Sequence, residues 1–99
     1  MRMNTDQSPV RLTQTVTITN TRGLHARAAA KLVTLAEKFS AALEVSRDGQ
    51  TVSAQSIMGL MMLGAGLGST VEISAEGWDA KEALAAVVEL VEAGFYETG

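Results

Sequence analysis

The sequence has no cysteine, and it contains a single histidine and a single proline. Without cysteine the chain has no disulfide framework and no thiolate zinc site. One histidine among scattered carboxylates also argues against a structural metal, so we expect neither a metal nor a cofactor. Aromatic residues are few as well, at 4%, which leaves the core mostly to alanine, valine, leucine, isoleucine and methionine.

Neither a strong charge of one sign nor a long hydrophobic run is present. The formal net charge is −3 at pH 7, which argues against nucleic acid as the main partner. The longest apolar run, residues 57–67, contains three glycines and is shorter than the roughly 20 residues that cross a bilayer. No secretory signal pattern is visible. We therefore expect a cytoplasmic protein with no membrane insertion. We also expect a monomer.

The chain is expected to form one folded domain over residues 13–99, preceded by a flexible tail over residues 1–12. Four segments alternate apolar and polar residues with period two, which predicts strands with one buried face. Asp48-Gly49 predicts a tight hairpin between the second and third of these strands. The predicted strands cover residues 16–19, 42–46, 51–53 and 71–75.

Three segments have the apolar spacing of helices, over residues 26–39, 56–63 and 79 to about 94. Asp79 followed by Glu82 predicts a capping box at the start of the last helix. The order β-α-β-β-α-β-α predicts an α+β fold, in which three helices cover one face of a four-stranded antiparallel sheet. The other face is expected to be hydrated. Ferredoxin-like modules share much of this order, so function must be inferred from the site.

The only histidine lies in Gly23-Leu24-His25-Ala26-Arg27, between the first predicted strand and the first predicted helix. Gly23 permits a sharp turn, and Leu24 is suited to anchor this segment in the core. The free N–H groups at a helix start bind anions, and Arg27 adds a guanidinium. His25 is therefore suited to carry a phosphoryl group on a ring nitrogen. The alternative is a histidine that merely caps the helix.

The second predicted helix has two features of its own. Ser56 is expected to cap its start, where a phosphate on the hydroxyl would add about −1.5 to −2 charge. Met58, Met61 and Met62 cannot all be buried in so short a helix. Exposed, flexible thioethers suit a surface that binds several partners.

A basic stripe of Arg27, Lys31 and Lys38 runs along the first predicted helix. Such a stripe is usually only a hydrated face. It also suits the steering of an acidic partner.

Two motifs together resemble a known family. Gly23-Leu24-His25-Ala26-Arg27, followed further along by Ser56-Ile57-Met58-Gly59-Leu60-Met61, resembles HPr, the histidine-containing phosphocarrier of the bacterial phosphoenolpyruvate-dependent phosphotransferase system. The resemblance covers residues from about 15 to 95. It implies an HPr-like open-faced β-sandwich. It also implies a phosphoryl carrier that is not an enzyme, because the protein is itself phosphorylated and then restored.

The resemblance also implies roles for individual residues. His25 would accept a phosphoryl group on Nδ1 from phosphorylated Enzyme I and pass it to an EIIA-type domain. Arg27 would neutralise the phosphoryl charge, and the backbone N–H groups of Ala26 and Arg27 would bind it. Ser56 would match the regulatory serine that HPr kinase/phosphorylase phosphorylates. The partner-binding residues would be Ile57, Met58, Met61, Met62 and Lys31.

The chain departs from the HPr pattern at Ala28, where the family usually has proline. We expect a slightly looser helix start and one more N–H donor near the phosphate. Asn20-Thr21-Arg22-Gly23 and residues 91–95 resemble NPr, the nitrogen-branch carrier, whereas residues 56–59 resemble HPr. A nitrogen-branch regulatory carrier is therefore the first alternative function. A ferredoxin-like ligand-binding module and a small acylphosphatase are more distant alternatives.

Overall fold

A computed structural model describes residues 11–97 of the chain. The elements follow the predicted order, with a short 3-10 helix added after the last α-helix. They are β1 (Arg11–Thr17), α1 (Ala26–Ala36), β2 (Ala42–Arg47), β3 (Gln50–Ser53), α2 (Ile57–Met62), β4 (Thr70–Glu76), α3 (Ala80–Glu92) and the 3-10 helix η1 (Gly94–Tyr96).

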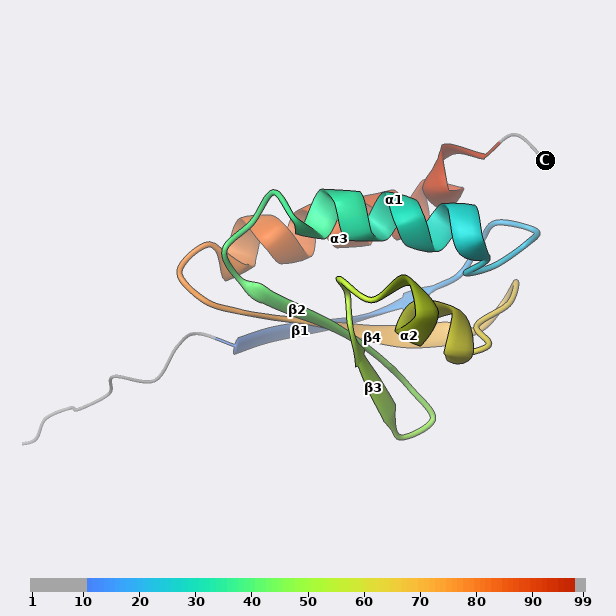
Figure 1. Cartoon of the computed structure of the whole chain (residues 1–99), viewed down its shortest axis with the longest axis horizontal. Coiled ribbons are helices and arrows are strands. Elements are labelled where there is room, and N and C mark those ends of the chain that lie inside the picture. Colours follow the sequence, from blue (N-terminus) through green and yellow to red (C-terminus); the bar gives the residue numbers. More distant parts are fainter. Residues whose placement is uncertain (1–10, 98–99) are drawn as a thin grey trace, which may run out of the picture.

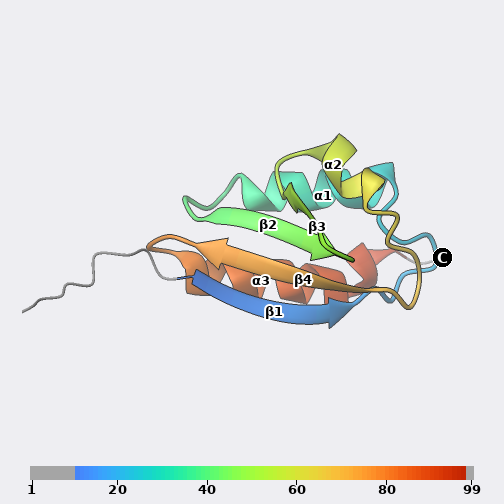
Figure 2. The same cartoon turned by 90° about the horizontal axis from the view of Figure 1, so that it is seen from below.

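The four strands form one antiparallel sheet in the order β1-β4-β2-β3, as Figure 2 shows. β4 is central, and it pairs with β1 through Val16 and Val71 and with β2 through Val45 and Ile73. β2 and β3 form the predicted hairpin, in which Asp48 and Gly49 have φ angles of 51° and 82°. Two consecutive residues with positive φ make the tight turn that matches the twist of the strands.

The helices lie on one face of this sheet (Figures 1 and 2). α1 and α3 run across the face, while α2 packs beside β3 and against α1. The opposite face carries exposed polar residues such as Thr13, Thr15 and Glu72, so the predicted hydrated face is confirmed. Ser74 on this face is buried at 4% exposure, because its strand is central and Thr13 and Glu44 flank it.

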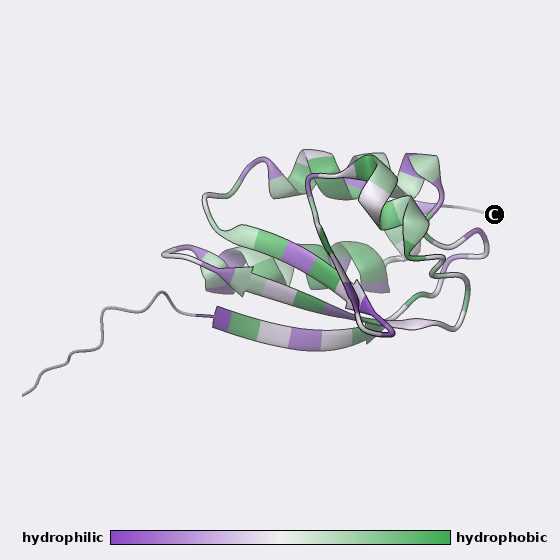
Figure 3. Cartoon of the chain, turned by 60° about the horizontal axis from the view of Figure 1, so that its bottom comes forward, coloured by the Kyte–Doolittle hydropathy of each residue, from purple (hydrophilic) through white to green (hydrophobic). Residues whose placement is uncertain are grey.

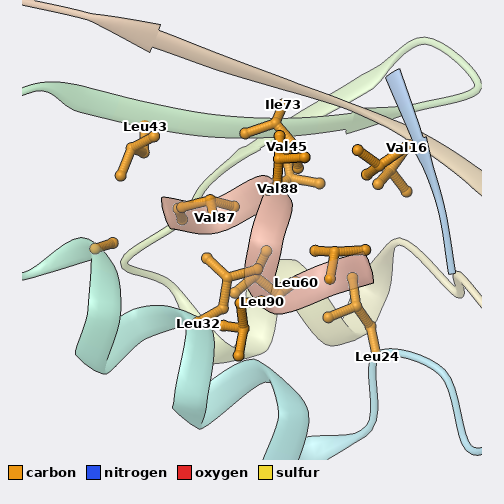
Figure 4. Packing of buried hydrophobic residues seen from close by; sticks show 14 of the residues in the cluster. Val16, Leu24, Leu32, Leu43, Val45, Leu60, Ile73, Val87, Val88 and Leu90 are labelled. Atoms are coloured by element: carbon orange, nitrogen blue, oxygen red, sulfur yellow. The ribbon is translucent and has the colours of Figure 1, made fainter. Parts of the chain in front are cut away.

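The core fills the space between the helices and the sheet. Figure 4 shows Leu32 of α1, Leu60 of α2 and Leu90 of α3 pointing into the same space beneath Val45 and Ile73. Burial of aliphatic side chains from every layer holds the layers together, at about 25 cal/mol per Å² of apolar surface removed from water. The apolar positions spaced along the last predicted helix are buried, at Leu84, Val87, Val88 and Val91 of α3 and at Phe95 of η1.

Several predicted boundaries differ from the structure. β1 covers residues 11–17 rather than 16–19, so Arg11 and Leu12 pair with β4 although they were assigned to the tail. Of that predicted tail, residues 1–10 lie outside the described residues. α1 ends at Ala36 rather than Phe39, because the chain turns there toward β2. Phe39 still packs against the core from the turn.

The predicted capping box at the start of α3 is wrong. Asp79 is the N-cap residue, but its side chain makes no hydrogen bond to the helix. Its carboxylate instead accepts hydrogen bonds from the backbone N–H groups of Ser40 and Ala41, at 2.8 and 2.7 Å. The carboxylate binds these two N–H groups of the turn after α1 instead of the N–H groups of its own helix. Asp79 is buried between that turn and the start of α3.

No helix within residues 11–97 combines the length and the apolar composition needed to cross a membrane.

Candidate functional site

His25 is the N-cap residue of α1, so the predicted position at the helix start is confirmed. Its backbone is extended, with φ −77° and ψ 179°, and its carbonyl accepts the first intrahelical hydrogen bond from Ala29 N–H at 2.9 Å. The N–H groups of Ala26, Arg27 and Ala28 precede that bond and have no intrahelical acceptor. His25 Nδ1 accepts from Arg27 N–H over 3.3 Å, which is a long and weak hydrogen bond.

Gly23 and Leu24 hold this segment against the loop that follows α2. Gly23 has a φ of +65°, and a Cβ on it would lie 2.4 Å from the carbonyl oxygen of Ala65. Leu24 N–H donates to that same oxygen at 2.9 Å, and its side chain is buried at 6% exposure. The chain passes so close to the loop that only glycine fits, which confirms both the predicted turn and the predicted anchor.

The other ring nitrogen of His25 is bound by a residue that the sequence did not single out. His25 Nε2 is hydrogen-bonded to Glu97 Oε2, and the two side chains are 15% and 13% exposed. The second carboxylate oxygen of Glu97 accepts from Asn20 Nδ2 at 3.0 Å. Asn20 Nδ2 also donates to the carbonyl of Gly23 at 2.8 Å. The loop before His25 and the segment after α3 are thus joined around the imidazole.

These hydrogen bonds favour one tautomer of His25. An ionised carboxylate only accepts hydrogen bonds, so the proton of a neutral ring lies on Nε2, facing Glu97. Nδ1 then has a lone pair, in agreement with its acceptance of the Arg27 N–H. The site therefore directs a nucleophilic nitrogen lone pair toward the N-terminus of α1.

The pKa of the Glu97 carboxyl is lowered by its hydrogen bonds. The hydrogen bond with His25, followed by that from Asn20, holds the pKa of the Glu97 carboxyl below its usual value of 4.5. The positive charge of Lys31 contributes in the same direction, whereas desolvation opposes it. The carboxylate is therefore charged at neutral pH, beside the ring.

The segment that carries Glu97 is held in place by its own contacts. Gly94, Phe95 and Tyr96 all have positive φ, between 57° and 63°, so the chain reverses sharply after α3. Phe95 is fully buried, and its carbonyl accepts a hydrogen bond from Lys31 Nζ at 2.6 Å. In Figures 1 and 2 this segment lies at the end of the molecule where α1 begins. Lys31, predicted as a partner-binding residue, thus already binds within the chain.

Arg27 is exposed on the first turn of α1. Among residues 11–97, no group of three or more His, Cys, Asp or Glu side chains is arranged to hold a metal ion. Within the same residues, the Arg27 guanidinium makes no hydrogen bond or ion pair. The long arginine side chain therefore has room to fold toward an anion at Nδ1.

α2 presents the apolar surface that its short length predicts. We call Ile57, Met58, Met61 and Met62 the methionine surface; their exposed fractions are 40%, 70%, 41% and 70%. Figure 3 shows hydrophobic residues along α2, and Figures 1 and 2 place α2 beside the start of α1. Exposed clusters of apolar side chains are candidates for interaction surfaces.

Ile57 shares the helical spacing of Leu60 and Leu63, but its burial differs from theirs. Only Leu60 and Leu63 are buried, because Ile57 begins the helix and projects beyond the core.

Ser56 caps α2 as predicted, its Oγ accepting from Gly59 N–H at 2.9 Å. Within the described part of the chain, no hydrogen bond connects Ser56 to His25 or Arg27. The serine is half-buried and borders the methionine surface. It belongs to a second helix start, separate from that of His25.

Comparisons with known proteins identify a family and solved structures with the same fold. The family described as PTS HPr component phosphorylation site matches residues 12–93. The chain is 49% identical over 86 residues to the phosphocarrier protein HPr of Cupriavidus necator, covering 87% of this chain and 97% of that one. It is 45% identical over 87 residues to the phosphocarrier protein NPr of Shewanella violacea, covering 88% and 96%. The crystal structure of HPr-C-His from Thermoanaerobacter tengcongensis matches with a TM-score of 0.84 at 46% identity, covering 89% and 99%.

Proposed function

The chain belongs to the HPr family of phosphocarrier proteins of the phosphotransferase system, and on that premise we propose that His25 carries the phosphoryl group on Nδ1. Such a carrier is not an enzyme, because it is modified and then restored. The observation that supports His25 is its ring geometry, with Nε2 held by Glu97 and the Nδ1 lone pair facing the N–H groups of α1. A histidine that only capped the helix would not need the second contact.

The proposed step is a direct transfer. The Nδ1 lone pair of His25 forms a bond to the phosphorus of the donor. The bond between phosphorus and the donor atom breaks, and its electron pair stays on the donor. The proton on Nε2 remains in place. The Arg27 N–H, which is only weakly bound to Nδ1, is then released to the phosphoryl oxygens.

The start of α1 stabilises the bound phosphoryl group. The N–H groups of Ala26 and Arg27 donate to its oxygens, and the helix dipole contributes about 0.3–1 kcal/mol, rising to ~2 kcal/mol where the site is partly buried. Ala28, in place of the usual proline, offers one more N–H. The Arg27 guanidinium folds over the oxygens and neutralises their charge.

The family implies phosphotransferase partners in general, and we propose Enzyme I as the donor and an EIIA-type domain as the acceptor. Both would dock on the methionine surface, whose exposed thioethers adapt to different partners. Lys31, also proposed as a partner-binding residue, would add positive charge on α1, where its ammonium group lies at the Phe95 carbonyl. We propose a monomer as the working form, because every residue of the site comes from one folded unit. A cytoplasmic location is proposed because the proposed partners belong to the phosphotransferase system.

Ser56 is the proposed regulatory site, with HPr kinase/phosphorylase as the modifying enzyme. A phosphate on Oγ would sit at the start of α2 and border the methionine surface. Because a doubly charged group is costly to desolvate in an apolar interface, the phosphate should weaken docking of Enzyme I. Ser56→Asp keeps a capping side chain and adds charge, whereas Ser56→Asn keeps the cap without charge. We expect Enzyme I to phosphorylate His25 more slowly in Ser56→Asp than in the unmodified chain, and at the unmodified rate in Ser56→Asn. Equal rates in the two variants would contradict the regulatory role of Ser56.

The nitrogen-branch carrier is the second candidate function. The identity to an NPr protein and the Asn20-Thr21-Arg22-Gly23 stretch favour it, while the Ser56 motif favours a serine-regulated HPr. Both candidates use the same His25 chemistry and differ in their partners.

The decisive experiment is incubation with phosphoenolpyruvate, Mg²⁺ and purified Enzyme I of either branch, followed by intact mass and mild acid. We expect the mass of one phosphate, which acid removes, because a phosphorus–nitrogen bond is acid-labile. The Enzyme I that supports the faster transfer indicates the branch.

Two variants make the assignment specific. His25→Ala should accept no phosphate while remaining folded, and Arg22→Ala, which removes an exposed arginine of the preceding loop, should behave as the unmodified chain. Absence of any mass gain with both Enzymes I would overturn the carrier role of His25.

A further inference from the structure

Glu97 lies 72 positions after His25 and outside both sequence motifs, yet it makes the contact that orients the ring. Three anchors hold it there. Asn20 donates to its second oxygen, Lys31 binds the carbonyl two residues before it, and Phe95 is buried in the core. The contact thus joins the loop before α1, the middle of α1 and the segment after α3.

We propose that Glu97 is a positioning residue for phosphoryl transfer, which orients the His25 ring and then balances the charge that the ring acquires on phosphorylation. This inference deepens the proposed function and rests on it. The role is separate from that of Arg27. Arg27 is proposed to bind the phosphoryl oxygens on the Nδ1 side of the ring, whereas Glu97 contacts Nε2.

The first part of the role concerns the unphosphorylated ring. Neutral imidazole has two tautomers, and only the one with its proton on Nε2 has a lone pair on Nδ1. A carboxylate at Nε2 favours that tautomer and fixes the ring plane, because it can only accept. The chain therefore presents the nucleophilic nitrogen at the start of α1 before a donor arrives.

The second part concerns the phosphorylated ring. When Nδ1 bonds to phosphorus and Nε2 keeps its proton, the ring carries a positive charge. The ionised Glu97 carboxylate neutralises this charge across the existing hydrogen bond. A ring that keeps its Nε2 proton is also the better leaving group for onward transfer, because it departs as a neutral imidazole. Glu97 thereby supports both acceptance and release.

Other charged groups around the pair set its electrostatic balance. Lys31 and Arg27 on α1 are both positive; Lys31 acts on Glu97 directly, and Arg27 lies at the phosphoryl side. Glu92, at the end of α3, lines the groove that Glu97 also borders. Glu92 makes no hydrogen bond to His25, so within the described residues Glu97 is the carboxylate that contacts the ring.

The test compares Glu97→Gln with Glu92→Gln, which removes an equal charge from the same groove. Nitrogen NMR of the unphosphorylated proteins reports the tautomer of His25. We expect the form with the proton on Nδ1 to rise several-fold in Glu97→Gln and to stay unchanged in Glu92→Gln. A purely structural role would leave the tautomer unaltered in both.

The second readout is the pH profile of phosphate loss from each phosphorylated protein. In Glu97→Gln the Nε2 proton should be lost at a pH lower by about one unit, a tenfold change in the proton equilibrium. Onward transfer to an EIIA domain at neutral pH should slow correspondingly. An unchanged tautomer together with an unchanged profile would overturn the role of Glu97.

The experiments distinguish failure of the proposed carrier function from failure of the role of Glu97. If the unmodified chain accepts no phosphate, His25 is not the carrier, but the tautomer measurement still shows whether Glu97 orients the ring.

Discussion

At the scale of single residues, Gly23 decides how His25 reaches the helix start. Its positive φ and its approach to the carbonyl of Ala65 leave no room for a side chain. Leu24 then makes a backbone hydrogen bond to the same carbonyl, which fixes the residue next to His25. The position of the imidazole is therefore set by a close backbone contact two residues earlier, not by the ring alone.

Substitution Gly23→Ala should destabilise the chain by about 2–4 kcal/mol, because backbone strain adds to the clash with Ala65. Gly49→Ala is the matched control: Gly49 also has positive φ, but a Cβ there meets nothing within 4 Å. It should cost only about 1–2 kcal/mol of strain. Urea unfolding of both variants measures the difference, and equal losses would show that the close approach to Ala65 is unimportant.

At the scale of elements, Asp79 joins the start of α3 to the turn after α1. Its buried carboxylate accepts two backbone N–H groups from residues 40 and 41. The turn leads from α1 into β2, so this contact holds the connection between the two elements against the start of α3. The same side chain would otherwise have capped its own helix.

Asp79→Ala should lower the free energy of unfolding by about 2–4 kcal/mol, since two buried donors lose a charged acceptor. Glu82→Ala, which removes the other half of the predicted capping box, is exposed and should change it by less than about 0.5 kcal/mol. Chemical denaturation of the two variants checks this contrast. A large loss of stability in Glu82→Ala would indicate that Glu82 caps the start of α3 after all.

At the scale of the whole molecule, the pairing of Glu97 with His25 joins the segment after α3 to the start of α1, 72 positions earlier in the sequence. Glu97 has a folded-state pKa below 4.5, so the folded state binds its proton less readily than the unfolded chain does. The stabilisation is therefore complete above the unfolded pKa and is lost as the pH falls through the lower folded pKa.

Acid unfolding should reveal this linkage. As the pH falls below 4.5, the unmodified chain should lose more of its stability than Glu97→Gln does, because the variant has no carboxyl to protonate. Urea midpoints measured at neutral pH and in acid provide the comparison, with Glu92→Gln as the charge-matched control. Parallel acid curves for Glu97→Gln and the unmodified chain would mean that the pair does not couple to folding.

The local features of this protein were determined by the sequence itself. Period-two and helical apolar spacing identified the elements and the buried stripe of α3, and Asp48-Gly49 identified the hairpin. Gly23, His25 and Ser56 were likewise assigned from neighbouring residues, because turns and helix caps depend on a few adjacent positions.

Only the tertiary structure decided the contacts between distant segments. The ring of His25 is oriented by Glu97, Asp79 serves a turn 38 positions away rather than its own helix, and Lys31 binds the carbonyl of Phe95. Each of these side chains has ordinary local alternatives that spacing alone cannot rank. The choice depends on which backbone groups the packed helices and sheet bring within hydrogen-bonding distance, and that becomes defined only when the core is formed.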